Sequence, residues 1–313
     1  MATPVLPVGL WPVMLTPFRD DGSIDFAGLQ RLTDFYIDAG SAGLFANCLS
    51  SEMFQLNPEE RLSIVRCVVQ QAGGRVPVVA CGNFERDAAS AGHFIARMGE
   101  CGVAAVVLIT GMLTGAGEDD SRLMAAAEAI MESTGDIPLG LYECPQPYKR
   151  LLTAEMIGRL AASGRFLYHK DTSCRSDHIR EKLRATGGTA LRFYNADTPT
   201  ALQSLLDGAH GLSPIGANFY PELYAALIGR VRSGGMNRDV GELHARLAVM
   251  DRLCHHLYPL TAKLFLKLRG LDIGPTLRLP TDRPAEGDRI RLEALLKVFR
   301  TMAGDLGITP VLP

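Results

Sequence analysis

Short apolar runs alternate with longer stretches of mixed apolar and polar residues through most of the chain. Runs of this length with few polar residues are typical of strands buried on both faces of a sheet. The runs occupy Leu10–Leu15, Gly43–Asn47, Val76–Cys81, Ala104–Ile109, Ile137–Tyr142, Phe166–His169, Leu191–Tyr194 and Gly211–Ser213. Amphipathic helical patterns lie between them, at Phe26–Ala39, Pro58–Gln71, Asp87–Cys101, Asp119–Thr134, Ala154–Ala162, Asp177–Thr186 and Thr198–Asp207. Strands that alternate with helices predict a parallel sheet.

Signals for the start and the end of helices support these boundaries. Asn57 provides an N-cap ahead of Pro58 at the first helical position, and acidic residues follow. Glycine, the residue that most often ends a helix, follows the last helical turn at Gly40, Gly102, Gly135 and Gly164. The helical stretches are therefore separate helices between the strands.

Eight strand–helix units favour an α/β fold in which the sheet closes into a (β/α)8 TIM barrel. An open doubly wound sheet is the alternative, but no glycine-rich dinucleotide turn follows the first strand. Beyond residue 221 only helices are predicted, at Pro221–Ser233, Val240–His256, Thr261–Leu268 and Gly287–Asp305. We therefore predict a barrel core in residues 1–220. Residues 221–313 should form the last barrel helix and a C-terminal helical extension that packs on the barrel.

Composition and charge narrow the classes of protein to which this chain could belong. Of 313 residues, 47% are hydrophobic and 21% are charged, as in globular domains with a large core. The net charge of −2 provides no electrostatic reason for binding nucleic acid or an anionic membrane. No run reaches the roughly 18 apolar residues of a membrane span, and residues 1–16 lack the features of a signal peptide. We expect a cytoplasmic protein.

The seven cysteines are scattered, without a CxxC pair or a Cys/His cluster at metal-ligand spacing. We expect reduced thiols, with Cys48 and Cys144 as small apolar fillers, and neither a metal nor a cofactor.

Active sites of such barrels form at the C-terminal ends of the strands, and Lys170 follows the sixth run. Apolar surroundings disfavour an ammonium ion, which lowers the pKa of a lysine and leaves an amine that can attack a carbonyl. The alternative is an ordinary lysine with its charge in water or in an ion pair. That interpretation fits the other lysines, at positions 149, 182, 263, 267 and 297.

Tyr142 ends the fifth run. Consecutive parallel strands usually lie side by side, about 4.8 Å apart, so Tyr142 and Lys170 should share one pocket. A phenol there can move the protons that Schiff-base formation requires. A tyrosine that only packs in the core is the alternative.

Several short motifs occur in order and at the predicted strand ends. They are Thr16-Pro17-Phe18, residues 20–25, residues 56–61, Tyr142 followed by Pro145, residues 170–173, and Gly216-Ala217-Asn218. From about Val8 to Leu227 they resemble the dihydrodipicolinate synthase and N-acetylneuraminate lyase superfamily of Schiff-base-forming barrels. The resemblance implies that Lys170 condenses with the keto carbon of pyruvate or of a pyruvate-like substrate, and that Tyr142 is the general acid and base. It also implies a homo-oligomer, commonly a tetramer.

The segment after the second strand is typically Gly-Thr-Thr-Gly-Glu or Gly-Ser-Thr-Gly-Glu in that family, where it binds the substrate carboxylate. Here it reads Cys48-Leu49-Ser50-Ser51-Glu52. The backbone amides of Leu49 and Ser50 can still donate, and Ser50 keeps a hydroxyl. The resemblance therefore implies that Leu49 and Ser50 bind the carboxylate.

Three departures argue against dihydrodipicolinate synthase activity itself. Leu49 replaces a hydroxyl residue, so a proton relay through it cannot operate in the same form. The tyrosine that the synthases place after the fourth strand is absent from residues 110–113, and Pro147 stands where they have an arginine for the second substrate.

Thr172 matches a hydroxyl residue of the sugar-acid lyases, and Asn195 and Asp197 lie in the loop that contacts sugar hydroxyls in those relatives, although Ala196 stands where a glycine is typical. Asp197 could instead cap the following helix. These features favour an aldolase-type lyase for pyruvate or a 2-keto-3-deoxy acid. The alternatives are a dehydratase using the same Schiff base and a barrel that only binds a keto acid. For Glu143 we expect a cap over the pocket, an ion pair with Lys149 or Arg150, or a solvated carboxylate.

Overall fold

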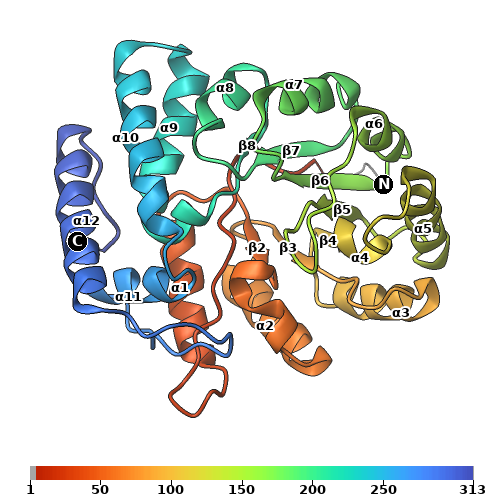
Figure 1. Cartoon of the computed structure of the whole chain (residues 1–313), viewed down its shortest axis with the longest axis horizontal. Coiled ribbons are helices and arrows are strands. Elements are labelled where there is room, and N and C mark those ends of the chain that lie inside the picture. Colours follow the sequence, from red (N-terminus) through yellow and green to blue (C-terminus); the bar gives the residue numbers. More distant parts are fainter. Residues whose placement is uncertain (1–4, 313) are drawn as a thin grey trace.

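Eight parallel strands form one curved sheet at the centre of the molecule (Figure 1). The computed structural model describes residues 5–312. The strands are β1 (Gly9–Leu10), β2 (Leu44–Ala46), β3 (Val78–Cys81), β4 (Ala105–Ile109), β5 (Leu139–Tyr142), β6 (Phe166–Asp171), β7 (Arg192–Asn195) and β8 (Gly211–Leu212). Neighbours follow the order β1-β8-β7-β6-β5-β4-β3-β2. Isolated parallel bridges, Leu10 to Ser41 and Val13 to Phe45, close the remaining gap between the segments of β1 and β2. The predicted (β/α)8 barrel is confirmed.

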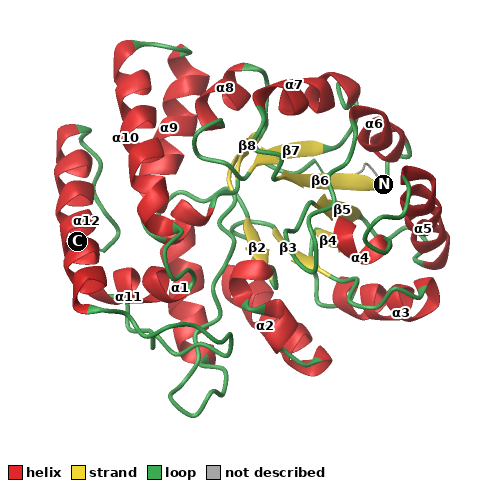
Figure 2. Ribbon diagram, viewed as in Figure 1, coloured by secondary structure: helices red, strands yellow, loops and turns green. Residues whose placement is uncertain are grey.

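Helices cover the outside of the sheet, and the last ones in the sequence stack farther out, as Figure 2 shows. They are α1 (Phe26–Asp38), α2 (Pro58–Ala72), α3 (Ala88–Gly99), α4 (Thr110–Leu113), α5 (Asp120–Ser133), α6 (Ala154–Ala162), α7 (Ser176–Ala185), α8 (Ala201–Leu206), α9 (Pro221–Gly234), α10 (Arg238–Cys254), α11 (Leu260–Leu268) and α12 (Glu286–Asp305). Three short 3₁₀ turns, η1 (Leu49–Ser51), η2 (Met53–Gln55) and η3 (Ile215–Asn218), follow β2 and β8. No helix within residues 5–312 is both long and apolar enough to cross a membrane.

The helix signals in the sequence act as expected at α2. The Asn57 side chain accepts a hydrogen bond from the Glu60 amide at 2.9 Å, and the Glu60 carboxylate accepts one from the Asn57 amide at 2.9 Å. This reciprocal pair satisfies amides that have no partner inside the helix. Gly73 then ends α2 at φ 55°, in the left-handed region that glycine adopts without strain.

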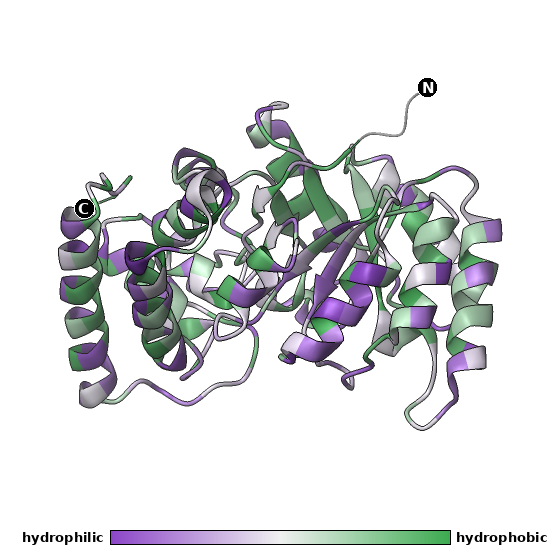
Figure 3. Cartoon of the chain, turned by 90° about the horizontal axis from the view of Figure 1, so that it is seen from above, coloured by the Kyte–Doolittle hydropathy of each residue, from purple (hydrophilic) through white to green (hydrophobic). Residues whose placement is uncertain are grey.

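Two hydrophobic clusters hold the barrel together. One fills its interior and includes Trp11, Phe45, Tyr168 and Tyr194. The rings of Tyr168 and Tyr194 stack at 4.8 Å. The other cluster lies between the strands and the helices. In Figure 3 several strands near the centre are green, with purple stretches among them, and the surrounding helices carry both green and purple residues. The barrel interior is therefore packed, which leaves the strand ends for a binding site.

Three differences from the sequence prediction concern β1, β6 and α4. The ladder of β1 is shorter than Leu10–Leu15, because only Gly9 and Leu10 pair with β8. β6 continues past His169 through Asp171, so Lys170 lies within the strand rather than after it. The short helix α4 follows β4 directly and was not expected, since four residues carry no readable periodicity.

The C-terminal helices pack against the barrel through buried ion pairs. Lys263 of α11 lies 3.0 Å from Glu52, which follows β2. Arg269 pairs with Glu222 of α9 and donates to the carbonyl of Phe219 at 2.8 Å. The proposed division between residues 220 and 221 stays a prediction. α9 begins at Pro221, and residues 1–4 and 313 of the two proposed segments lie outside the described part.

Candidate active site

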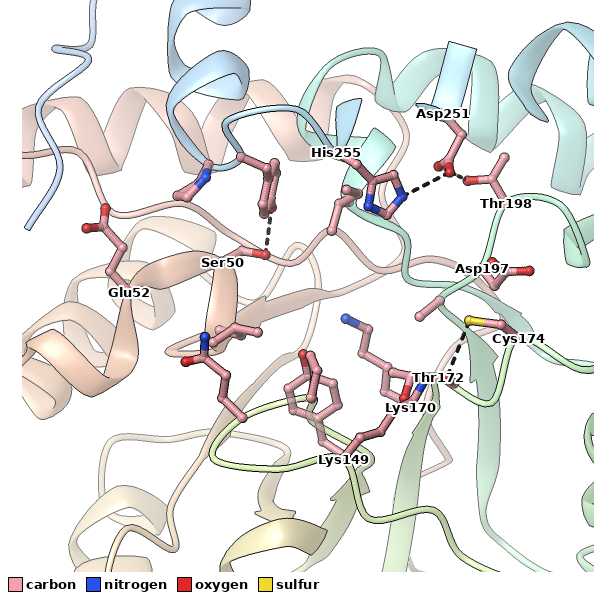
Figure 4. Close-up of a pocket in the computed structure, with 18 of the residues that line it drawn as sticks. Ser50, Glu52, Lys149, Lys170, Thr172, Cys174, Asp197, Thr198, Asp251 and His255 are labelled. Atoms are coloured by element: carbon pink, nitrogen blue, oxygen red, sulfur yellow. Dashed lines mark hydrogen bonds and ion pairs between the residues drawn. The ribbon is translucent and has the colours of Figure 1, made fainter. Parts of the chain in front are cut away.

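A pocket of about 370 Å³ lies at the C-terminal ends of the strands. Segments that follow β2, β7 and β8 line it, together with the ends of β5 and β6 and the segment between α10 and α11. In Figure 4 the labelled side chains of Ser50, His255, Asp197 and Thr172 surround the amine of Lys170. The pocket is thus built from residues that are far apart in the sequence.

Lys170 and Tyr142 are adjacent in the pocket because β5 and β6 pair residue by residue at this point. The Lys170 Nζ lies 4.6 Å from the centroid of the Tyr142 ring, and the lysine is only 3% exposed. Burial lowers the pKa of Lys170, and the nearby titratable groups that oppose this shift are the thiols of Cys48, Cys144 and Cys81. No ion pair of Lys170 occurs among residues 5–312; the carboxylates of Glu143 and Asp171 are paired with another lysine. The neutral form of the amine is therefore more populated at Lys170 than at an exposed lysine.

The groups beside Lys170 keep their protons. Burial raises the pKa of Tyr142 well above its ordinary value, so its phenol is neutral and can donate. Its ring packs edge-on against Phe45, with the centroids 5.5 Å apart. Burial also raises the pKa of the Cys48 thiol, and it raises that of Cys144 to about 11. Both cysteines are buried thiols, in keeping with the expected role as fillers.

Four of the five expected substrate-binding residues line the pocket: Leu49, Ser50, Thr172 and Asp197. The Thr172 hydroxyl donates to the carbonyl of Glu143 at 2.6 Å, which leaves its oxygen as an acceptor toward the pocket. The Asp197 carboxylate accepts from the Thr200 amide at 3.0 Å, just ahead of α8. Asp197 therefore combines a pocket position with a contact in the turn ahead of α8, whose N-cap is Thr200 rather than Asp197.

Asn195 does not line the pocket. Its side chain is fully buried and donates to the hydroxyls of Thr200 at 2.9 Å and Ser204 at 3.1 Å. Its oxygen accepts from the Asp197 amide at 2.9 Å. Residues alternate between the two sides of a strand, and the Asn195 side chain is on the side that faces α8. Asn195 thus holds the loop that carries Asp197 and does not reach the pocket.

Glu143 has a different partner from those expected. It is fully buried and forms an ion pair with Lys182 of α7, which also lies 2.6 Å from Asp171. Burial alone would lower the pKa of Lys182, but the two carboxylates raise it. Arg150 instead pairs with Asp120. The interpretation of Lys182 as an ion-paired lysine is in agreement with this arrangement.

Glu143, His169 and Asp171 also bring ligand-type atoms within 4.8 Å of one another. The Lys182 ammonium already lies against both carboxylates. Burial opposes a low pKa for Asp171, yet His169 and Lys182 together hold it below its ordinary value. The cluster is a buried charge network in which the Lys182 ammonium lies where a metal ion would otherwise balance the two carboxylates.

The sequence patterns missed one wall of the pocket. Asp251, His255 and Tyr258 come from the end of α10 and the segment after it. His255 Nε2 lies 3.1 Å from Asp251, which also accepts from the Thr198 hydroxyl at 2.6 Å (Figure 4). This ion pair raises the pKa of His255 despite partial burial. The i, i+4 spacing of Asp251 and His255 was the one signal present, but nothing in it placed α10 at the strand ends.

Sequence comparisons identify relatives of this chain. Residues 7–299 match the model of the dihydrodipicolinate synthetase family. A 4-hydroxy-tetrahydrodipicolinate synthase of Methylococcus capsulatus is 30% identical over 85% of this chain and 90% of its own. One of Laribacter hongkongensis is 31% identical over 91% and 96%, respectively.

Solved structures share the fold. A dihydrodipicolinate synthase from Bacillus anthracis has a TM-score of 0.83 and 24% identity over 93% of this chain and 97% of its own. A prophage protein of the same family from Escherichia coli K12, solved with pyruvate, has a TM-score of 0.83 and 23% identity over 94% and 98%. With the family model covering most of the sequence, the chain belongs to the dihydrodipicolinate synthetase family of aldolase-type lyases.

Proposed function

We propose that the chain is a class I aldolase that forms a Schiff base between Lys170 and pyruvate or a 2-keto-3-deoxy acid. The observation that carries this proposal is a buried lysine amine beside a neutral phenol, in a pocket at the strand ends. A lysine with a lowered pKa is the nucleophile that this chemistry requires. The intact pair of Lys170 and Tyr142 argues against the alternative of a barrel that only binds a keto acid.

The reaction follows from the properties of the iminium ion. The Lys170 amine attacks the keto carbon, and loss of water leaves the iminium. When the C4 hydroxyl loses its proton, the C3–C4 bond breaks, an aldehyde leaves and the electron pair remains on C3 as an enamine. Protonation of C3 and hydrolysis then release pyruvate and the free lysine. Tyr142, which pairs with Lys170 in the register of β5 and β6, would move protons to and from the carbinolamine and the substrate.

The substrate carboxylate would lie at Ser50 and Leu49, and the remaining polar groups would lie near Thr172 and Asp197. Condensation with aspartate semialdehyde is not favoured, although relatives near 30% identity are named 4-hydroxy-tetrahydrodipicolinate synthase. Leu113 and Pro147, at the positions of the tyrosine and the arginine of the synthases, do not line the pocket. Lys149 does line it, and it could bind an anionic group at the far end of a substrate.

Trapping tests the Schiff base directly. Borohydride added with pyruvate should reduce the iminium and attach the pyruvate mass to Lys170, as read by intact mass and peptide mapping. Lys170→Ala should lose the adduct, whereas Lys149→Ala, which changes another lysine of the same pocket, should keep it. An adduct on Lys149, or none in the native chain, would refute the assignment.

Product analysis separates the three functions. With a panel of 2-keto-3-deoxy acids, pyruvate release indicates the aldolase and a loss of one water from the acid indicates the dehydratase. In the dehydratase the same iminium keeps its C3–C4 bond, loses a proton from C3 to give an enamine, and then expels the C4 hydroxyl as water. Adduct without turnover of any acid indicates a binding protein. We expect turnover on the panel to exceed condensation of pyruvate with aspartate semialdehyde, and the reverse result would show that the departures at Leu49 and Pro147 were misinterpreted.

A further inference from the structure

Tyr258 reaches the pocket from the segment between α10 and α11, outside the barrel strands. Its hydroxyl donates to the Ser50 Oγ at 2.6 Å, the contact drawn at Ser50 in Figure 4. Both residues line the pocket that contains Lys170. A residue of the C-terminal region thus contacts the one hydroxyl that remains in the segment after β2.

The direction of this hydrogen bond is determined by Asn218. The Asn218 amide nitrogen donates to the carbonyl of Val13 at 2.8 Å, and a carbonyl can only accept, so the orientation of the amide is settled. Its other proton goes to the Tyr258 oxygen at 2.6 Å, while its own oxygen accepts from Tyr36. Tyr258 is therefore an acceptor toward Asn218, and its single proton must go to Ser50.

Ser50 is left with a proton to donate. Its Oγ accepts from Tyr258, and within residues 5–312 no protein acceptor takes the Ser50 hydroxyl proton. Ser50 is buried but lines the pocket, so that proton is available to a ligand. A hydroxyl that accepts a hydrogen bond also becomes a better donor through mutual polarisation. Burial raises the pKa of Tyr258, which keeps the phenol protonated as the donor.

We propose that Tyr258 is a positioning residue that turns the Ser50 hydroxyl into a dedicated donor for the carboxylate of the 2-keto acid at Lys170. The proposal rests on the proposed function. Leu49 has no hydroxyl, so Ser50 is the side-chain donor of this segment toward the pocket, and a chain of hydrogen bonds from the C-terminal region compensates for the lost group. Hydrogen bonds to a carboxylate are about twice as strong as neutral ones, which makes the orientation of this proton matter.

The test compares two ketones that differ only in the carboxylate. Pyruvate and acetone are each trapped on Lys170 with borohydride, and the half-saturating concentration is measured by intact mass. Tyr258→Phe should raise the value for pyruvate by about tenfold, the equivalent of one lost hydrogen bond to a charged group, and leave that for acetone unchanged. Ser50→Ala should have the same effect, and the double variant should lose no more than either single one, because both act through one hydroxyl.

Tyr220→Phe is the matched control. The Tyr220 hydroxyl contacts the Cys254 Sγ at 3.0 Å, and Tyr220 does not line the pocket, so this variant should trap both ketones like the native chain. Asn218→Asp provides a second test of the Tyr258–Ser50 hydrogen bond if Tyr258→Phe does not fold. An aspartate cannot donate to Tyr258, so the phenol proton can turn away from Ser50, and the same loss for pyruvate alone is expected.

The two proposals fail in different ways. No pyruvate adduct on Lys170 of the native chain would overturn the Schiff base itself. A native adduct with an unchanged half-saturation in Tyr258→Phe would overturn the role of Tyr258 alone. An equal loss for pyruvate and acetone would also overturn it, because it would show a general disturbance of the pocket rather than loss of a carboxylate donor.

Discussion

Three buried lysines illustrate how the surroundings of a residue decide its chemistry. Lys182 lies between two carboxylates, and they raise its pKa. Lys263 has one carboxylate partner, Glu52, and burial outweighs it, so its pKa falls to about 8. Lys170 has neighbouring thiols instead of a carboxylate, and burial lowers its pKa. Burial is common to all three lysines, and only Lys170 combines it with a position beside the Tyr142 phenol.

This environment predicts the pH dependence of trapping. Only the neutral amine attacks a carbonyl, so the rate of pyruvate trapping should rise with pH and level off once Lys170 has lost its proton. Because burial lowers the pKa of Lys170, the midpoint should lie below the ~10.4 of a free lysine. Trapping by quenched flow from pH 6 to about 11.5, beyond the value of a free lysine, measures it. A midpoint at or above the value of a free lysine would contradict the role of burial.

At the scale of elements, β5, β6 and α7 meet beneath the pocket in one charge network. Glu143 follows β5, Asp171 ends β6, and Lys182 lies on α7. Glu143 also accepts from the amides of Leu152 and Thr172, at 2.9 and 3.0 Å. The network therefore fixes the two strand ends that carry Tyr142 and Lys170, and it keeps both carboxylates away from Lys170.

Lys182→Met tests the strength of this network. The substitution keeps an unbranched side chain but leaves two buried carboxylates without their cation. Removing one partner of a buried ion pair typically costs about 3–5 kcal/mol, and the free energy of unfolding in urea should fall by that order. Lys267→Met, which replaces an exposed lysine of α11, is the control and should change little. A similar small change at both positions would show that the network does not stabilise the fold.

At the scale of the whole molecule, the C-terminal helices are part of the site. Tyr258 binds Ser50, and Lys263 binds Glu52, so two residues of the segment after β2 are held by residues beyond α10. Glu52 also accepts from the amides of Arg278 and Leu279, at 2.7 and 2.8 Å. The homo-oligomer expected from the resemblance stays a prediction, which native mass measurement can check against the 33.8 kDa of one chain.

Lys263→Met should loosen this docking. Glu52 would keep its two amide donors but lose its cation, so the contact between α11 and the barrel should weaken before the barrel itself unfolds. Hydrogen exchange should become faster in α11 and in residues 49–55 than in β5 and β6. Adding Glu52→Gln, which removes the unpaired charge, should restore part of the protection. Uniform exchange over the whole chain would contradict a local role.

The sequence by itself determined the order of the elements and placed Tyr142 and Lys170 at the ends of neighbouring strands. Strands buried on both faces must be apolar and helices between them must be amphipathic, so the barrel could be found from periodicity. The positions of polar residues at strand ends made Lys170 and Tyr142 candidates, and the resemblance to a known family implied their roles, which stay predictions. The same reliance on apolar runs predicted the end of β6 too early. A lysine and an aspartate interrupt the apolar run, although the strand continues through them.

The tertiary structure decided which side chains meet. Asn195 faces α8 rather than the pocket, Glu143 binds Lys182, and Tyr258 binds Ser50 across 208 positions of the chain. Local patterns report whether a residue is buried, since burial follows the periodicity of its own element. They do not report which distant element covers it, because that depends on how the helices pack on the sheet and on one another. The pocket wall from α10 to α11 therefore became visible only in the folded molecule.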